Sequence, residues 1–457
     1  MKKKAYRIEL FDHEQAILYY PKNLQFPELN SVTFGSYRME ATILPHKTKK
    51  QTIAISKSLA NQLNVPSIPL KLHLVEHEKN LFIGPIIGIF TAGFTKFPQV
   101  PIGNRSYNFS KYFKDYEAIG VLPIVFGIQH IEWEKGTVNG FFYFDSKWQQ
   151  LTIPLPNVIY DRLPNRKIEN LKQMKQLKEK IEKEYKIPWF NPGFFDKLDV
   201  YQKLSQSIDV KPLLPDTFPL ESKKQFLELI ENHHYLYVKP RNGSLGKGIY
   251  QIKVIKGRFF VRFRELEKTR LLKFPSVQSL WKYLLSKITI SDYIIQRGIP
   301  LWKLGESVAD FRIHTNKDKH GKWRVSAIAG KVAGLGSATT HLIAGGEVKS
   351  LDEIFPVEQE RKEQLQKLKT AAILLSEHLE KKMDGILCEI GFDLGMDENG
   401  KLWMFEANSK PGRSIFSHPK LKNIEQLSRN YVLEYGIYLA NDVIIRPEKY
   451  FHDFVLQ

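Results

Sequence analysis

Cysteine is almost absent from this 457-residue sequence, in which Cys388 is the only one. A single cysteine excludes a disulfide bond within the chain and is typical of a reducing compartment. Because Cys388 lies between Leu387 and Glu389 in a strand-like run, we expect it to be a core residue rather than a nucleophile.

The chain also lacks long apolar runs. The longest ones, residues 81–94 and 120–128, are interrupted by glycine and proline, so neither predicts a membrane span. Residues 1–7 have the basic start of a signal peptide, but acidic residues follow where an apolar core would be needed. We therefore expect no signal peptide and an intracellular protein.

Charge is the one unusual feature of the composition, with a net value of +19 at pH 7. Such a charge attracts polyanions, including nucleic acids, acidic polymers and nucleotide phosphates. However, the basic residues are spread along the chain, often beside glutamates, and no RNA-recognition signature, paired Cys/His finger or basic zipper is present. We expect a solvated basic surface, with binding of an acidic polymer as the alternative, and no dedicated nucleic-acid module.

A chain of this length exceeds a single simple core, and its pattern predicts three domains. Residues 1–100 contain short strands and turns, which predict a small, mostly β domain. In residues 101–194 strands alternate with helical segments, which predicts an α/β domain with a small parallel sheet. Residues 195–457 form a larger third unit, and all the motifs with chemical potential lie there.

The most informative segment of that unit is FDLGMDENGKLWMFEANSKPG, residues 392–412. Two alternating apolar runs flank Asp-Glu-Asn-Gly, a strong hairpin turn signal. Glu406 and Asn408 point to the same face of the returning strand, and Asp393 can lie across from them. Three such oxygen ligands suit Mg²⁺. An exposed acidic hairpin is the alternative, but the Glu-x-Asn pair inside an apolar strand favours a metal site.

A glycine-rich loop joins two predicted strands earlier in the same unit. Gly243, Gly246 and Gly248 allow backbone N–H groups to approach an anion, and Lys239 and Lys247 supply positive charge. The loop fits neither the phosphate-binding pattern G-x-x-x-x-G-K-[ST] nor the dinucleotide pattern G-x-G-x-x-G. It predicts a flap that closes over phosphates, with an ordinary glycine-rich hairpin as the alternative.

Two more strands carry polar groups. The strand at residues 293–299 ends in polar backbone that could hydrogen-bond an adenine edge as a hinge. Asp310 and Arg312 share one face of the next strand and could contact ribose and phosphate, with a surface ion pair as the alternative.

These pieces, in this order between residues 196 and 412, resemble the ATP-grasp superfamily. The resemblance implies an ATP-grasp fold of the α/β (α+β) class, a pre-ATP-grasp α/β domain before it, and ATP and Mg²⁺ as cofactors. It assigns the phosphates to Lys197, Lys239, Gly243, Ser244, Gly246, Lys247 and Gly248, the adenine to Gln296, Arg297, Gly298 and Ile299, the ribose or phosphate to Asp310, and the metal to Asp393, Glu406 and Asn408.

The sequence departs from the superfamily pattern in two places. Arg297 follows Gln296 where an acidic residue is frequent, and residues 339–341 stand where Arg-Ser-Asn is expected. Arg312 or Lys331 would then have to supply the missing phosphate charge.

Three further residues are candidates for the acceptor side of the site. Lys410 and Arg413 follow the metal strand and could hold a substrate carboxylate, with a solvated basic turn as the alternative. His341 could assist proton transfer, although a structural hydrogen bond is the simpler role.

Within the superfamily, the runs VKPRNGSLGKG, ADFRIH and EANSKPGR look like the YheC/YheD group of endospore coat-associated proteins, and the length is more similar to that of its longer member. This resemblance implies a spore-forming bacterium, with the protein in the mother-cell cytoplasm or the spore coat. ATP-grasp enzymes typically activate a carboxylate as an acyl phosphate, so it also implies an ATP-dependent carboxylate–amine (or thiol) ligase acting on a peptide, cell-wall or spore-related substrate. Two alternatives stay open: a coat scaffold that binds ATP without turnover alongside coat proteins, and a basic protein that binds acidic polymers and has a regulatory nucleotide site.

Overall fold

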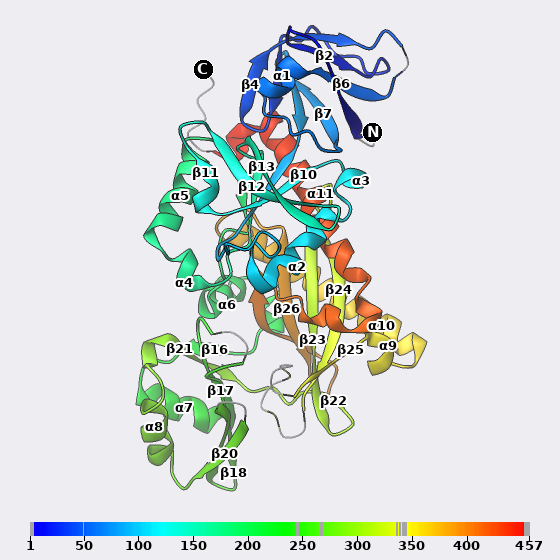
Figure 1. Cartoon of the computed structure of the whole chain (residues 1–457). Helices are drawn as coiled ribbons and strands as arrows, with labels where there is room; N and C mark the ends of the chain where they lie inside the picture. The colour runs from blue at the N-terminus through cyan, green and yellow to red at the C-terminus, as the bar shows by residue number, and fades with distance from the viewer. Residues whose placement is uncertain are drawn as a thin grey trace.

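The structure, a computed structural model, describes residues 4–48, 50–243, 246–265, 268–334, 337, 340 and 345–451. These residues form four β-sheets with helices packed against them, so the fold is of the mixed α/β class that the sequence predicts. The molecule is elongated, with the N-terminal strands at one end and strands β17 to β20 at the other (Figure 1). No helix in the described part of the chain is long and apolar enough to cross a membrane.

The first sheet has eight strands in the order β4-β3-β8-β7-β1-β6-β2-β5. Its strands are β1 (Tyr6–Phe11), β2 (Ile17–Tyr20), β3 (Ser31–Phe34), β4 (Tyr37–Glu40), β5 (Thr42–Pro45), β6 (Thr52–Ser56), β7 (Lys71–His77) and β8 (Asn80–Gly84). The short helix α1 (Lys57–Gln62) follows β6 directly, because the Ser56 hydroxyl accepts a hydrogen bond from Leu59 N and caps the first turn.

The second sheet runs β11-β12-β10-β9-β14-β15, with β13 paired to β12. Its strands are β9 (Ile86–Phe90), β10 (Leu122–Phe126), β11 (Ile131–Glu132), β12 (Thr137–Phe144), β13 (Lys147–Pro154), β14 (Val158–Asp161) and β15 (Trp189–Phe190). Strands β10, β9, β14 and β15 are parallel neighbours, as expected for this α/β region. Helices α2 (Ser106–Ser110), α3 (Tyr116–Ile119), α4 (Arg166–Glu169) and α5 (Lys172–Lys183) accompany them.

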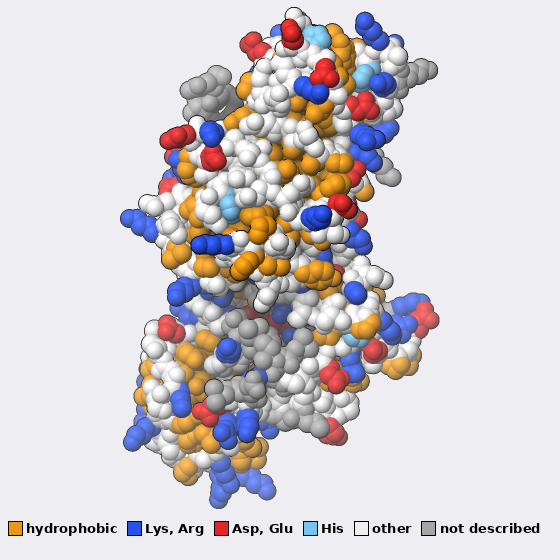
Figure 2. Space-filling model, viewed as in Figure 1, with side chains coloured by type: hydrophobic (Ala, Val, Ile, Leu, Met, Phe, Trp, Pro, Cys, Tyr) orange, Lys and Arg blue, Asp and Glu red, His pale blue; other side chains and the backbone are white. Residues whose placement is uncertain are grey.

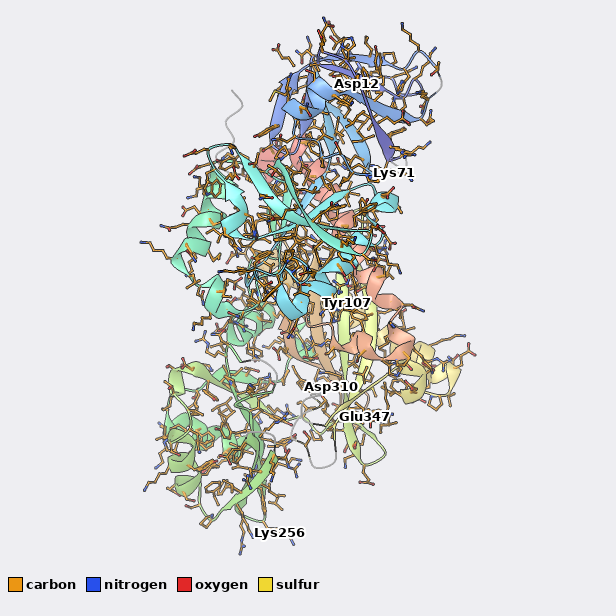
Figure 3. The ribbon with its side chains drawn as sticks, viewed as in Figure 1. Asp12, Lys71, Tyr107, Lys256, Asp310 and Glu347 are labelled. Carbon is orange, nitrogen blue, oxygen red and sulfur yellow. The ribbon has the colours of Figure 1, made fainter. Side chains whose placement is uncertain are left out.

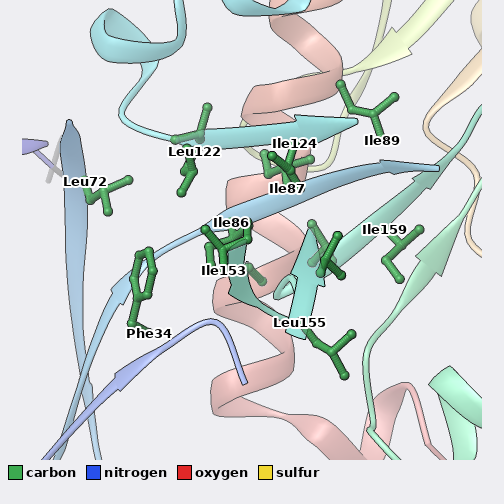
Figure 4. Close-up of a cluster of buried hydrophobic side chains, with 14 of the residues drawn as sticks. Phe34, Leu72, Ile86, Ile87, Ile89, Leu122, Ile124, Ile153, Leu155 and Ile159 are labelled. Carbon is green, nitrogen blue, oxygen red and sulfur yellow. The ribbon is translucent and has the colours of Figure 1, made fainter. Parts of the chain in front are cut away.

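One hydrophobic core joins these two sheets. Phe34 and Leu72 of the first sheet belong to the same buried cluster as Ile86, Leu122 and Ile159 of the second (Figure 4). The C-terminal helix α11 (Ile424–Ile445) contributes Val432, Leu433 and Leu439 to that cluster. Residues on both sides of the predicted boundary at residue 100 share this core. The division into three domains therefore stays a prediction.

The third sheet is antiparallel, in the order β16-β21-β17-β18-β19-β20. Its strands are β16 (Thr217–Pro219), β17 (Tyr235–Pro240), β18 (Tyr250–Ile255), β19 (Arg258–Glu265), β20 (Lys268–Phe274) and β21 (Tyr293–Arg297). Helices α7 (Lys223–His233) and α8 (Val277–Leu285) pack against it around a separate core. Lys and Arg side chains gather over its outer end (Figure 2), in agreement with a solvated basic surface.

The fourth sheet runs β25-β24-β23-β26-β27, with β22 paired to β23. Its strands are β22 (Lys303–Leu304), β23 (Ser307–Lys317), β24 (Trp323–Val332), β25 (Glu347–Lys349), β26 (Glu389–Met396) and β27 (Leu402–Asn408). Helices α6 (Lys197–Ser205), α9 (Leu351–Ile354) and α10 (Glu358–Lys382) accompany this sheet. The predicted hairpin is present as β26 and β27, and its turn is fixed by Asp397, whose carboxylate accepts hydrogen bonds from Asn399 N and Lys401 N.

Candidate functional site

A cavity of about 140 Å³ lies between the third and fourth sheets. Figure 3 labels Asp310, one of its lining residues, where β23 approaches the third sheet. Apolar side chains line one part of the cavity: Ile249, Ile299, Leu301, Val308 and Phe405. Of the residues predicted from the sequence, it brings together Lys197, Lys239, Gly243, Gly246, Lys247, Gln296, Ile299, Asp310, Lys331, Asp393 and Glu406.

Two lysines extend into this cavity from different elements. Lys197 begins α6, whose N-terminus is capped by the Asp196 carboxylate. Its Nζ donates to Gly243 O at 2.7 Å and lies 3.3 Å from Glu406 Oε1. Lys239 of β17 is buried, and its Nζ donates to Gln296 Oε1 at 2.8 Å and to Phe405 O at 3.3 Å. Both ammonium groups are therefore held in the wall of the cavity, and their binding of phosphates stays a prediction.

Burial disfavours the charged form of a lysine. Burial, with a smaller contribution from the nearby Lys197, lowers the pKa of Lys239 to about 8. The ammonium is thus present at neutral pH and lost in mildly alkaline solution.

This gives a prediction for the pH dependence of nucleotide binding. Between pH 7.5 and 9.5 the affinity for ATP should fall about tenfold, since a hydrogen bond to a charged group contributes about 1.5–3 kcal/mol. Isothermal titration across this range measures the effect. Lys239→Arg keeps its charge throughout, so an equal fall in that variant would contradict the assignment to Lys239.

The predicted metal hairpin places Asp393 directly opposite Glu406, next to a register shift between Asp393 and Leu394. Both carboxylates line the cavity. Asp393 is buried, so the alternative of an exposed acidic hairpin is wrong at this position. Hard, paired oxygen donors of this kind fit Mg²⁺.

Asn408 fits the predicted metal set less well. It lies opposite Gly391 at the end of β27 and is absent from the described lining of the cavity. Within the described ranges, no group of three or more His, Cys, Asp and Glu side chains is arranged to hold an ion. The two facing carboxylates and Asn408 therefore remain predicted ligands.

A buried ion-pair network supports the carboxylates. Lys331 Nζ lies 2.8 Å from Asp393 Oδ1 and 3.0 Å from Asp310 Oδ1, and Arg312 Nε lies 3.0 Å from Asp393 Oδ1. Burial alone would lower the pKa of Lys331, but Asp310 and Asp393 raise it above its usual value. Asp310 and Arg312 are thus not the surface ion pair considered as an alternative, and Lys331 is held as a cation at the edge of the cavity.

The glycine flap meets the cavity through Gly243, Gly246 and Lys247. Gly248 has φ +71, and a Cβ there would lie 2.8 Å from the Tyr293 hydroxyl, so this position requires glycine. The predicted site residues Ser244 and His341 lie outside the described residues.

Only two of the four described residues predicted to form the hinge line the cavity. Gln296 and Ile299 line the cavity, but Arg297 N donates to Asp216 O and Gly298 N donates to Tyr235 O, each at 2.8 Å. These two N–H groups are already used within the protein. Gln296 has a role that the sequence did not reveal, because its amide joins Lys239 to Thr217.

Lys410 and Arg413 lie near the cavity but do not line it in the described structure. Lys410 Nζ donates to Asp161 at 2.7 Å and to Glu169 at 2.8 Å, and Arg413 Nη2 donates to Glu389 at 2.6 Å. Only 2% of the Lys410 side chain is exposed, so the alternative of a solvated basic turn is wrong. Both residues line a second cavity, described below.

Known proteins resemble this chain over most of its length. A family model described as "YheC/D like ATP-grasp" matches residues 186–439, which include every predicted site residue. The endospore coat-associated protein YheD of Bacillus subtilis (strain 168) is 39% identical over 449 residues, covering 98% of this chain and 99% of that protein. The endospore coat-associated protein YheC of the same strain is 24% identical over 285 residues, covering 62% and 78%.

Among solved structures, D-alanyl-alanine synthetase A from Vibrio cholerae matches 79% of this chain and 99% of its own, with a TM-score of 0.44 and 11% identity. The family match and the long, 39% identical relative decide the classification. This chain belongs to the YheC/YheD family of ATP-grasp proteins.

Proposed function

We propose that this protein binds ATP with Mg²⁺ in the cavity between the third and fourth sheets and uses it to activate a carboxylate as an acyl phosphate. Formation of the acyl phosphate releases ADP. An amine or thiol then attacks the acyl carbon, inorganic phosphate leaves, and the product is an amide or thioester. The observation that carries the proposal is the meeting of Lys197 and Lys239 with the facing carboxylates Asp393 and Glu406 in one part-apolar cavity.

The residues that line the cavity have different roles, which follow from their positions. The apolar lining accommodates the base, while Lys197, Lys239 and the backbone of the flap bind the phosphates. Asp393 and Glu406 would hold Mg²⁺, which supplies charge neutralisation at the transferred phosphoryl group. Lys331 keeps Asp310 and Asp393 in place.

ATP binding without turnover is the second candidate. Arg312 and Lys331 already neutralise Asp393 within the protein, and Arg297 replaces a frequent hinge carboxylate. Such a protein would serve as an ATP-binding scaffold beside other coat proteins. Because the relatives are endospore coat-associated proteins, we propose the same setting for this chain.

One experiment separates the two candidates. ADP release is measured with ATP, Mg²⁺ and a panel of amino acids, dipeptides and cell-wall fragments as carboxylate and amine donors. Release that depends on one acceptor supports the ligase, whereas ATP binding with no release across the panel supports the scaffold.

The ion site has its own test. Glu406→Gln should weaken calorimetric binding of ATP in the presence of Mg²⁺ about tenfold or more, because one charged ligand is lost. The binding of ATP with EDTA should change little. Glu398→Gln, an exposed change in the turn of the same hairpin, is the control. Equal affinities for all three proteins would remove Glu406 from the ion site.

A further inference from the structure

A second cavity, of about 290 Å³, lies beside the turn that follows β27. Five cationic side chains line it, and its described lining contains no carboxylate. They come from four separate parts of the chain: Arg105, Arg162, Lys410, Arg413 and Arg429. This concentration of positive charge is the strongest feature of the structure that the ATP site does not use.

The surrounding carboxylates are too few to neutralise these cations. Asp161 and Glu169 pair with Lys410, Glu389 pairs with Arg413 and Arg162, and Glu425 pairs with Arg429. Two more cations share the same acids, since Lys178 contacts Asp161 and Lys111 contacts Glu425.

Arg105 makes no ion pair among the described residues. Its guanidinium donates to Thr91 Oγ1 and to the carbonyl oxygen of Ala92. Six cations therefore share four carboxylates around this cavity, and Arg105 adds a seventh positive charge with no carboxylate partner among the described residues.

Some side-chain nitrogen atoms of these arginines also make no hydrogen bond within the described residues. Arg413 Nε and Arg429 Nε are buried and have no hydrogen-bond partner in the described part of the chain, and Arg162 Nη1 has only its 3.5 Å ion pair with Glu389 Oε2. Buried polar atoms of proteins are nearly always hydrogen-bonded, because leaving one unpaired destabilises the fold. The guanidinium groups around this cavity therefore have hydrogen-bonding capacity that the described acceptors do not use.

The concentration of positive charge shifts the pKa values of two residues in the cavity lining. Burial alone would raise the pKa of Tyr112, but Arg413, Arg429 and Arg162 lower it below its usual value. Burial and then the proximity of Arg162 lower the pKa of Arg105. Both shifts agree with an unneutralised surplus of positive charge.

We infer that this cavity binds the doubly charged oxyanion group of a substrate, either a phosphate monoester or a pair of carboxylates. Arginine forks match both groups, because each presents several oxygen atoms to two or more N–H donors. A single carboxylate would leave most of the surplus charge in place. Phe109, Tyr112 and Phe194 add an aromatic wall for the remainder of the substrate.

The cavity is close enough to the ATP site for one extended substrate to reach both. Lys410 follows Glu406 by four residues along β27 and its continuation, which span at most about 13 Å. Pro411, which lines the second cavity, lies against Gly391, where a Cβ would meet it at 2.5 Å. Nη1 of Arg312, the partner of Asp393, lies 3.1 Å from the same Cβ position. As a substrate site this cavity rests on the proposed function, whereas its anion binding does not.

The test adds one negative charge to the cavity wall without touching its packing. Asn108 lines the cavity and is exposed, so Asn108→Asp is isosteric and should fold normally. Asn61→Asp makes the same change on the exposed face of α1. Calorimetry measures binding of inorganic phosphate, succinate and acetate to each protein, with the ATP site occupied by a non-hydrolysable ATP analogue and Mg²⁺.

Phosphate or succinate should bind saturably to the wild type and to Asn61→Asp, and about tenfold more weakly to Asn108→Asp. Phosphate alone points to a phosphate monoester and succinate alone to a dicarboxylate. Binding of acetate as tight as that of phosphate, equal phosphate binding by all proteins, or no saturable binding overturns the inference. Failure of the ATP analogue to bind, with phosphate binding intact, would instead contradict the proposed function.

Discussion

Replacing Lys239 by methionine should reduce ATP affinity about 100-fold while leaving the protein as stable as before. The ammonium is buried, and hydrogen bonds to charged groups contribute about 1.5–3 kcal/mol, more where water is excluded. The same burial of a charged group also lowers the stability of the folded protein, and the lowered pKa of Lys239 reflects this cost. Methionine fills a similar volume without that cost.

Two readouts separate binding from folding. Calorimetry gives the ATP affinity, and thermal unfolding without nucleotide gives the stability. Lys268→Met, an exposed change on β20 of the same sheet, should alter neither. If Lys239→Met binds ATP like the wild type, the phosphates lie elsewhere; if it loses ATP binding only because it unfolds, the thermal scan will show it.

Local signals were sufficient to predict the hairpin, whereas the assignment of phosphates to Lys197 and Lys239 came from the ATP-grasp resemblance and stays a prediction. Alternation and the Asp-x-x-Gly turn account for the pairing from Met396 and Leu402 to Leu394 and Met404. The register shift that follows, which the sequence did not predict, brings Asp393 opposite Glu406. The helix starting at Lys197 follows from its Asp196 cap. The turn and the helix start depend on neighbours within a few residues, so sequence patterns reveal them, whereas the register shift is not visible in the sequence.

Local sequence patterns could not predict which carboxylates surround Lys410. Its partners Asp161 and Glu169 lie 249 and 241 residues away in the chain, and nothing in the local pattern pairs them. For the same reason β9, which precedes residue 100, was not expected to be the central strand between β10 and β14. Sequence alternation gives the face of a strand, whereas sheet order depends on contacts across the whole fold.

The hinge shows a second limit of sequence patterns. Residues 296–299 were predicted as a set, but hydrogen bonds from Arg297 N to Asp216 and from Gly298 N to Tyr235 occupy two of their N–H groups. A strand pattern predicts which side chains are buried and leaves open which backbone groups are free.

Glu389→Gln should lower the free energy of unfolding by about 3–5 kcal/mol, because it removes one partner from a buried ion-pair cluster. The Glu389 side chain is fully buried and contacts Arg413, Arg162 and Tyr160. Burial alone would raise the pKa of Glu389, but Arg413 and then Arg162 lower it to about 2. Its contribution to stability is therefore complete above about pH 4.5 and is lost as the pH falls through 2.

The same substitution should strengthen anion binding in the second cavity. Removing the Glu389 charge releases Arg413 and Arg162, so a bound phosphate meets two arginines that no longer share a carboxylate. Chemical denaturation should show the loss of stability, and calorimetry below the unfolding transition should show phosphate bound several-fold more tightly. Glu169→Gln, which removes a partner of Lys410 that is not fully buried, should shift both quantities less. A Glu389 with a structural role alone would lower stability and leave phosphate affinity unchanged, so opposite shifts in the two measurements would tie this carboxylate to the charge of the second cavity.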